Sequence, residues 1–148
     1  MALNVKLTTE ELRLLLETGY LLRERRELQK AKEVFEGVQA LGQAADVASM
    51  GLADVLLVMG NVKDAEKALQ AAIKASPKFA LAHAQLGELY HTQGKKAEAV
   101  EELQKAESLD PQGTAGTFAK SVLKAVETGV DYKYGIPPEK KAAESKKK

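Results

Sequence analysis

The sequence predicts an all-α protein in which pairs of antiparallel helices repeat along the chain. Its 148 residues are rich in Ala, Leu, Glu, Lys and Gln, which are the strong helix formers. In addition, similar residues recur at a period of 34, as in Gly60 with Gly94 and Pro77 with Pro111. A fixed period of this length is typical of a solenoid built from helix hairpins. The apolar run 55–59 therefore belongs to a helix rather than to a buried strand.

Three copies of the repeat are present, over residues 12–45, 46–79 and 80–113. Each copy contains two stretches with apolar residues at helical spacing, and one further stretch follows the third copy. The helices that the sequence predicts lie near 9–24, 27–41, 45–59, 62–75, 79–92, 96–108 and 115–128.

Local signals mark where these helices begin and bend. One of the threonines of "TTEE" caps the first helix, and Glu11 stands at capping-box spacing from Thr8. Gly60 and Gly94 stand at the bends of the second and third copies, where a left-handed helix end favours glycine. In the first copy Arg26 takes this place. The prolines that close the second and third copies can stop one helix or open the next.

Small residues stand where the two helices of a pair cross. Helix axes approach to about 8 to 10 Å only when the side chains at the crossing leave room. Gly87 with Ala99, and Ala53 with Ala65, meet this requirement. We therefore expect these residues to lie in the contacts between paired helices.

The two ends of the chain differ from the repeats. Residues 1–8 are expected to form a leader, and they lack the basic start and apolar run of a secretory signal. The stretch 115–128 is apolar on one face and charged on the other, as expected of a helix that caps a solenoid. The repeat domain is thus expected to span 9–130. Residues 131–148 carry six Lys against three acidic residues without apolar periodicity, which predicts a disordered Lys-rich tail.

The repeat resembles the tetratricopeptide repeat (TPR). Small residues twelve positions apart, a bend glycine and a closing proline form this family's pattern, and the resemblance covers about 12–113. It implies a TPR-type right-handed α-solenoid of three helix hairpins plus a C-terminal capping helix. His83 stands where the family usually has Trp. The structural repeat positions are Gly19, Ala31, Phe35, Ala53, Gly60, Ala65, Pro77, Gly87, Tyr90, Gly94, Ala99 and Pro111.

A second resemblance is to the short three-repeat cytoplasmic chaperones of type III secretion systems, which hold apolar translocator proteins. The stretches "AKEVFEGVQALGQ", "GLADVLLVMGNVKDA" and "PKFALAHAQLGELYHTQGKKAEA" carry it. It implies a small bacterial chaperone or adaptor. The segment before the first repeat, which supplies that family's dimerisation element, is shorter here than expected.

In the tetratricopeptide family the first helix of each pair lines a concave, partner-binding face. Carried over position by position, the resemblance implies a groove formed by Leu16, Tyr20, Val47, Met50, Asp54, Leu57, Val58, Leu81, Ala84, Glu88 and His91. Independently of the family, the stretch 45–59 is apolar on two helix faces, so it is either buried on both sides or awaits a partner. The carboxylate of Asp54 favours a groove open to solvent, because its burial would be costly.

The residue types present argue against enzyme chemistry. The chain has no Cys, which excludes disulfides and Cys-ligated zinc. His83 and His91 lie about 12 Å apart along one helix axis, too far to share a metal ion. No nucleophile motif or phosphate loop occurs. We therefore expect a protein that is not an enzyme and has no metal, no cofactor and no small-molecule substrate.

The charge distribution argues against a body that binds nucleic acid. The net charge is +1, but residues 1–130 carry two more acidic than basic residues. We interpret "RERR", residues 23–26, as a complement to the dipole of the first helix. Leu16 and Tyr20 stand where tetratricopeptide clamps for acidic chaperone tails carry Lys and Asn, so such a tail is not the expected partner.

The sequence thus predicts a non-enzymatic protein-interaction module that binds an apolar peptide or helical segment of another protein. The alternative hypothesis is a self-associating structural or assembly scaffold, such as a homodimer, in which Leu14 and Leu21 of the first helix serve self-association. No stretch approaches the ~18 to 20 apolar residues of a membrane span. We expect the protein to be cytoplasmic.

Overall fold

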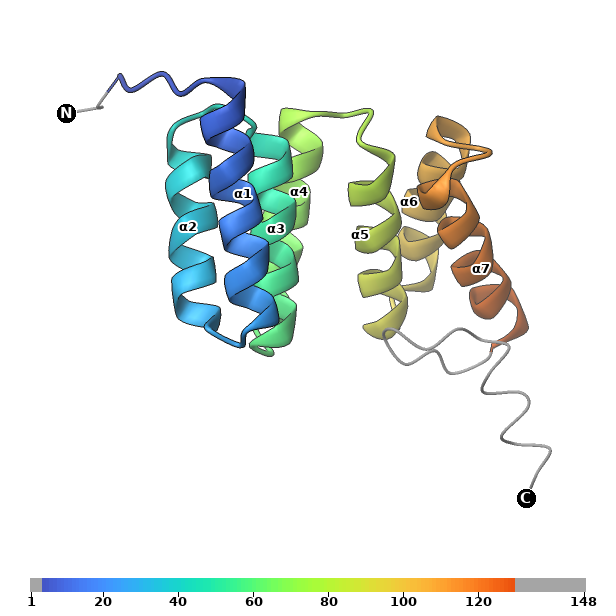
Figure 1. The fold of residues 1–148 in the computed structure, drawn as a ribbon. Coiled ribbons are helices and arrows are strands. Elements are labelled where there is room, and N and C mark those ends of the chain that lie inside the picture. The colour runs from blue at the N-terminus through green and yellow to red at the C-terminus, as the bar shows by residue number, and fades with distance from the viewer. Residues whose placement is uncertain (1–3, 130–148) are drawn as a thin grey trace. The chain divides into compact units, whose positions relative to one another are not determined.

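The computed structural model describes residues 4–129, and these form seven α-helices joined by short connections (Figure 1). The predicted Lys-rich tail and residues 1–3 of the leader lie outside the described part. The chain divides into two compact units, Met1–Pro77 (unit 1) and Lys78–Lys148 (unit 2). The helices are α1 (Thr9–Glu24), α2 (Leu28–Ala40), α3 (Ala45–Val58) and α4 (Val62–Ala75) in unit 1, and α5 (Ala80–Thr92), α6 (Lys96–Leu109) and α7 (Thr114–Thr128) in unit 2.

The all-α prediction is confirmed, and each predicted helix boundary agrees with the structure to within one residue. The capping box at the start of α1 is also present. The Glu11 amide donates to Thr8 Oγ1 at 3.2 Å, and the Thr8 amide donates to Glu11 Oε2 at 2.7 Å. Thr8 is therefore the N-cap, and the local sequence by itself fixes where the first helix begins.

The three predicted bends share one backbone conformation. Gly60 and Gly94 have φ angles of 82° and 75°, and Arg26 has a φ of 65°. In each bend the amide of the next residue donates back to a carbonyl five residues earlier, as in Glu27 N to Leu22 O at 2.9 Å. This is the Schellman helix ending. The first bend is thus built like the other two, but without the glycine that makes the conformation inexpensive.

In unit 1 the side chain of Phe35 on α2 fills the space between α1 and α3. It is 0% exposed. A Cβ atom built on Gly19 would lie 2.7 Å from Phe35 Cζ, and one built on Gly51 would lie 2.3 Å from Phe35 Cε1. The ring of Tyr20 meets Phe35 edge to face, with ring centroids 5.0 Å apart. The two glycines therefore make room for one aromatic ring that joins three helices.

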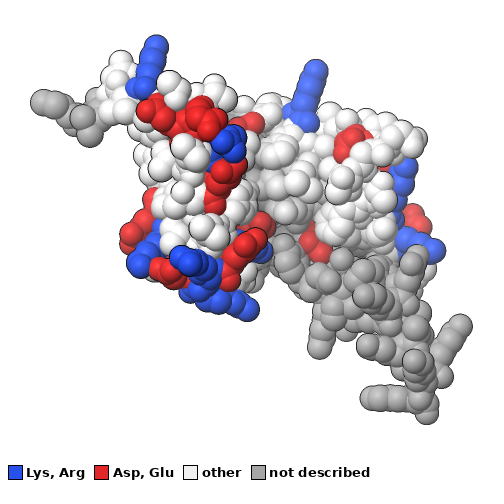
Figure 2. Space-filling view, in the orientation of Figure 1, with Lys and Arg blue, Asp and Glu red and all other residues white. Residues whose placement is uncertain are grey.

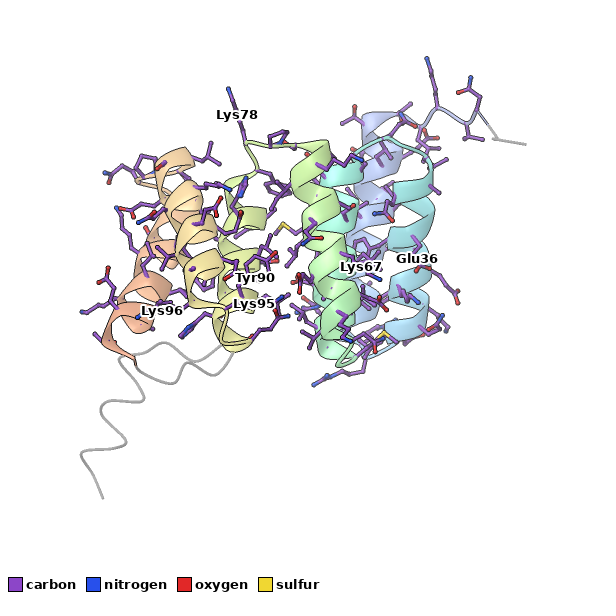
Figure 3. All side chains as sticks on the ribbon, turned by 180° about the vertical axis from the view of Figure 1, so that it is seen from behind. Glu36, Lys67, Lys78, Tyr90, Lys95 and Lys96 are labelled. Atoms are coloured by element: carbon purple, nitrogen blue, oxygen red, sulfur yellow. The ribbon has the colours of Figure 1, made fainter. Side chains whose placement is uncertain are left out.

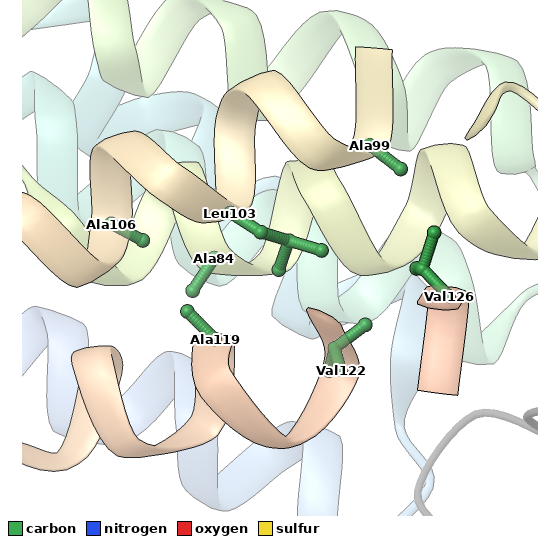
Figure 4. Packing of buried hydrophobic residues seen from close by; sticks show 7 residues of the cluster. All are labelled: Ala84, Ala99, Leu103, Ala106, Ala119, Val122 and Val126. Carbon is green, nitrogen blue, oxygen red and sulfur yellow. The ribbon is translucent and has the colours of Figure 1, made fainter. Parts of the chain in front are cut away.

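Unit 2 has its own apolar core, in which α7 packs against both α5 and α6. Figure 4 shows this core, which is made of Ala84, Ala99, Leu103, Ala106, Ala119, Val122 and Val126. A Cβ atom on Gly87 would lie 3.1 Å from the Ala99 carbonyl oxygen, which confirms the predicted close approach of α5 and α6. The buried face of α7 is the apolar face that the sequence predicted, and Lys120 and Lys124 on its other face are exposed.

His83 of α5 is buried and faces α6. Its Nδ1 lies 2.6 Å from Oε2 of Glu102, and Lys105 Nζ donates to the other oxygen of the same carboxylate at 2.9 Å. A polar contact between a ring and a carboxylate thus stands where the tetratricopeptide pattern usually has the apolar body of Trp.

Candidate partner-binding surface

The eleven residues predicted to line a groove are divided between the two units. Leu16 and Tyr20 lie on α1 of unit 1, and five others lie on α3 of the same unit. The remaining four, Leu81, Ala84, Glu88 and His91, lie on α5 of unit 2. The two sets are therefore described separately. The α3 residues are Val47, Met50, Asp54, Leu57 and Val58.

In unit 1, α1 and α3 are in direct contact, and the predicted residues of both helices meet beside Tyr20. Tyr20 is partly buried, and burial raises the pKa of its phenol. The negative charge of Asp54 on α3 raises it further, whereas the Arg23 guanidinium opposes this effect. The structure thus brings Tyr20 and Asp54 together, although they are 34 positions apart in the sequence.

We call the surface formed by Leu16, Tyr20, Val47, Met50, Asp54, Leu57 and Val58 the α1–α3 face. Most of its members are partly exposed, and Met50, at 7%, is nearly covered. The following α3–α4 bend adds two exposed apolar side chains, Met59 and Val62. Sequence reasoning did not assign these two residues to a surface; the signal that could have found them is their apolar character at a solvated bend.

In unit 2, Leu81 and His91 are partly exposed, whereas the other two predicted groove residues, Ala84 and Glu88, are buried. Ala84 is 0% exposed and belongs to the core cluster that includes residues of α7. Glu88 is 3% exposed. Because α7 packs on α5 at this level, the side chain of Ala84 faces the core of unit 2 and does not form part of its surface.

Comparison with known proteins agrees with the repeat pattern. Residues 50–114 match the family model described as tetratricopeptide repeat. These residues form tetratricopeptide repeats. No curated protein matches the sequence significantly.

Solved structures share the TPR fold. The Yersinia enterocolitica type III secretion translocator chaperone SycD is 18% identical with a TM-score of 0.73, over 86% of this chain and 90% of that one. PcrH from Pseudomonas aeruginosa is 16% identical with a TM-score of 0.75, over 86% of this chain and 99% of PcrH. The first TPR of Spaghetti (RPAP3), bound to the HSP90 peptide SRMEEVD, is 15% identical with a TM-score of 0.72, over 88% and 99%. At these identities the likeness establishes the fold alone.

The first TPR helix, α1, also carries apolar side chains on a second face. Leu14 and Leu21 are 51% and 53% exposed, and their spacing of seven places them on one side of the helix. Beside them Arg13 pairs with Glu10 and Glu17 along the helix surface. The structure thus presents both leucines of the self-association hypothesis to solvent.

A cleft of about 330 Å³ lies between the second helices of the first two repeats, α2 and α4. Leu52 and Leu56 of α3 form part of its lining. Figure 3 shows Glu36 and Lys67 on the two neighbouring helices. Each lies in an ion pair within its own helix, Glu36 with Lys32 at 3.5 Å and Lys67 with Asp64 at 3.7 Å. The rim is therefore balanced in charge and does not select an anion or a cation.

Within residues 4–129 no cluster of His, Cys, Asp and Glu could hold a metal ion. Across the same residues, no helix has the length and apolar character needed to cross a membrane. On α5 the Tyr90 ring carries the ammonium group of Lys95 over its face, 5.0 Å from the ring centroid, as Figure 3 shows. This contact lies at the third bend and stabilises it locally.

Proposed function

We propose that the protein is a non-enzymatic binding module that holds an apolar segment of another protein against the α1–α3 face. One observation carries this proposal. On α3, Val55 and Leu56 are buried, whereas the next two residues, Leu57 and Val58, remain partly exposed. The helix therefore presents large apolar side chains on a side that the core does not need, and such exposed surface on a protein marks an interaction site.

The composition of the α1–α3 face supports an apolar partner with some polar groups. Tyr20, which is partly exposed, is a residue type that binds partners well through a large rigid ring. Met50, a predicted member of the face, is 7% exposed and supports the face from beneath. Asp54 is only partly buried, so its carboxylate adds a polar marker without the full cost of desolvation. An extended or helical segment with apolar anchors would fit such a face.

The fold comparison supports a role as a small cytoplasmic chaperone or adaptor of the type III secretion kind. SycD has been solved with a peptide of the translocator YopD, and PcrH with the chaperone-binding region of PopD. In both cases a protein of this fold binds a peptide segment of another protein. We extend this mode of action to the present chain.

The test uses peptides selected from a random display library on the immobilised full chain. We expect apolar sequences to be enriched, and we expect Leu57→Glu to weaken their binding in fluorescence anisotropy by about tenfold or more, because a charge would replace an apolar contact. The matched control is Leu21→Glu, which places the same charge on exposed surface of α1.

Circular dichroism of both variants checks that the helices remain folded. If Leu57→Glu loses helicity, Val58→Glu replaces it, because Val58 is more exposed. Selected peptides that bind Leu57→Glu or Val58→Glu as tightly as the unaltered chain would contradict the proposal.

A second candidate function, self-association as a scaffold, is favoured by the exposure of Leu14 and Leu21. SycD itself has been solved as an alternative dimer. Sedimentation equilibrium over the micromolar range distinguishes the candidates. A mass that rises with concentration, and that Leu14→Glu returns to the monomer value, supports self-association. A monomer at every concentration excludes it.

A further inference from the structure

Three of the four arginines of the chain stand together at the bend between α1 and α2. Arg23 lies in the last turn of α1, Arg25 is its C-cap, and Arg26 is the left-handed residue of the bend. Figure 2 shows charged side chains gathered at the end of unit 1 where Figure 1 places this bend. We call Arg23, Arg25 and Arg26 the arginine corner.

The Arg23 side chain has an unmet hydrogen-bonding requirement. Its Nε atom is buried, and no acceptor among the described residues bonds to it. Buried donors in folded proteins nearly always have a partner, and a guanidinium can only donate. The Tyr20 phenol lies within electrostatic range of Arg23. Arg23 as a whole is partly exposed, so a rotation of its side chain would bring the covered Nε–H group to an external acceptor.

The conformation of Arg26 is a second, independent observation. The equivalent positions of the other two repeats are Gly60 and Gly94, and all three share the left-handed conformation. An arginine in this region is strained, because its Cβ crowds the backbone. Strain of this kind is retained at sites that use the residue. Among the described residues, Arg26 makes no side-chain hydrogen bond or ion pair that would explain its presence.

The other arginine of α1 and the lysine nearest the bend are engaged. Arg13, towards the start of α1, pairs with Glu10 and Glu17, and Lys30 Nζ lies 2.6 Å from Glu27 Oε2. The Lys30 hydrogen bond holds the pKa of Glu27 low, so this carboxylate is ionised and already has a partner. None of the arginine corner residues forms an ion pair with a described carboxylate. Arg25 acts on Glu27 and Arg23 acts on Tyr20 only through longer-range electrostatics, so the guanidinium groups can still bind an external anion directly.

We propose that the arginine corner binds the carboxylates of an acidic segment of a partner protein. The planar guanidinium donates two parallel hydrogen bonds to a carboxylate, which a lysine cannot do. Arg23 lies within electrostatic range of Tyr20 at the edge of the α1–α3 face, and Arg25 and Arg26 follow it on the bend. The corner would therefore add charge recognition and orientation to partner binding. Nothing in this proposal requires that the apolar face be occupied.

A nucleic acid is the less suitable anion for this corner. Unit 1 carries eleven acidic against ten basic residues, and Glu24 and Glu27 alternate with the arginines. A continuous phosphate backbone gains affinity by neutralising many phosphates along a basic surface, which this unit does not offer. A short acidic peptide carries fewer charges than a continuous phosphate backbone, so it meets less repulsion from Glu24 and Glu27.

The experiment follows the Nε–Hε signals of the four arginines by NMR on the ¹⁵N-labelled full chain. The probe is acetylated hexaglutamate amide, and hexaglutamine of the same length is the control peptide. We expect hexaglutamate to shift the Arg23 signal to saturation and to leave Arg13 unmoved, since Arg13 already has two carboxylate partners. Hexaglutamine should move neither signal.

The variant Arg25→Gln with Arg26→Gln should weaken hexaglutamate binding by about tenfold, since it removes two solvent-exposed charged contacts that each contribute a few-fold in affinity. Both side chains are exposed, so the fold is expected to survive, and circular dichroism checks this. The variant Arg13→Gln is the matched control and should not change the affinity.

Three results would overturn the proposal. One is an Arg23 signal that does not move at millimolar hexaglutamate. Another is an equal movement of Arg13, which would indicate general charge screening. The third is binding of a hexathymidylate at lower concentration than hexaglutamate, which would assign the corner to nucleic acid. Apolar peptides selected for the α1–α3 face should bind the Arg25→Gln/Arg26→Gln variant with unchanged affinity, so the two proposals fail independently.

Discussion

Replacing Gly51 by Ala tests whether the Phe35 ring joins α1, α2 and α3. In an open helix position this change would stabilise the protein by about 1 kcal/mol, because Ala favours the helix over Gly. In the structure, however, the added Cβ would lie 2.3 Å from Phe35 Cε1, 2.6 Å from Cζ and 2.7 Å from Cδ1. Real Cβ contacts are not this short, so the ring or the helix must move.

The ring has little room to move. Phe35 is 0% exposed, and a Cβ on Gly19 of α1 would already lie 2.7 Å from its Cζ. Overpacking of a core costs about 1 to 3 kcal/mol, and the upper end applies here because α1 and α3 both approach the end of the ring. After the helix gain of about 1 kcal/mol is subtracted, we expect Gly51→Ala to destabilise the chain by about 2 kcal/mol.

The chain offers a matched control in Gly37→Ala on α2. No atom lies within 4 Å of a Cβ built on Gly37, so this change should stabilise the protein by about 0.5 to 1 kcal/mol. Urea unfolding followed by far-UV circular dichroism measures both variants. The same chemical substitution is thus expected to have opposite signs at two helical glycines.

A double-mutant cycle makes the assignment specific to Phe35. Combining Gly51→Ala with Phe35→Leu should recover about 1 kcal/mol relative to the sum of the single changes, because the smaller side chain leaves space for the new methyl group. A Gly51→Ala variant as stable as Gly37→Ala, or a cycle with no coupling, would refute the packing described for unit 1.

Three further predictions concern the bend, the cap and the α1–α3 face. Arg26→Gly should stabilise the chain by about 0.5 to 1 kcal/mol in urea unfolding. The reason is that relief of the strain of the left-handed backbone conformation outweighs the added conformational entropy of the unfolded chain. A loss of stability would show that the arginine side chain supports the fold. The backbone and side-chain hydrogen bonds from Thr8 hold the Glu11 pKa below its ordinary 4.5. The stabilisation by this cap is therefore fully present above the unfolded-state pKa and is lost as the pH falls through the lower folded-state pKa. The NMR shift of the Thr8 amide measures this loss, and Thr8→Ala, which removes the side-chain hydrogen bond, should return the Glu11 pKa part of the way towards 4.5. Burial and, to a lesser degree, the charge of Asp54 raise the Tyr20 pKa. Asp54→Asn should therefore lower the Tyr20 pKa part of the way to its ordinary value in an ultraviolet titration. An unchanged Tyr20 pKa would show that the two side chains do not interact.

Much of the local structure could be predicted from the sequence because it depends on neighbours within one helical turn. Thr8 and Glu11 form their capping box with no help from the rest of the chain, and Gly60 and Gly94 take the left-handed conformation because only glycine does so without strain. The period of 34 then indicated which helices form a pair. Small residues such as Gly87 and Ala99 recur within each period, and they are needed where the axes of paired helices cross.

The candidate surface was only partly predictable, because burial depends on what packs against each residue from a distance. The tetratricopeptide resemblance implied that Ala84 belongs to a partner-binding face, but α7 covers it in the core of unit 2. Similarly, spacing could identify Asp54 and Tyr20 as members of two helix faces, whereas their proximity follows from the contact of α1 with α3.

The sequence alone therefore determined the helices, their bends and the repeat, since these rest on periodicity and on the conformational preferences of single residues. The tertiary structure decided which apolar residues stay exposed, that Phe35 requires glycine on both sides, and that Arg23 keeps a buried donor without an acceptor among the described residues. These features arise from atoms brought together across tens of residues, which no local pattern records.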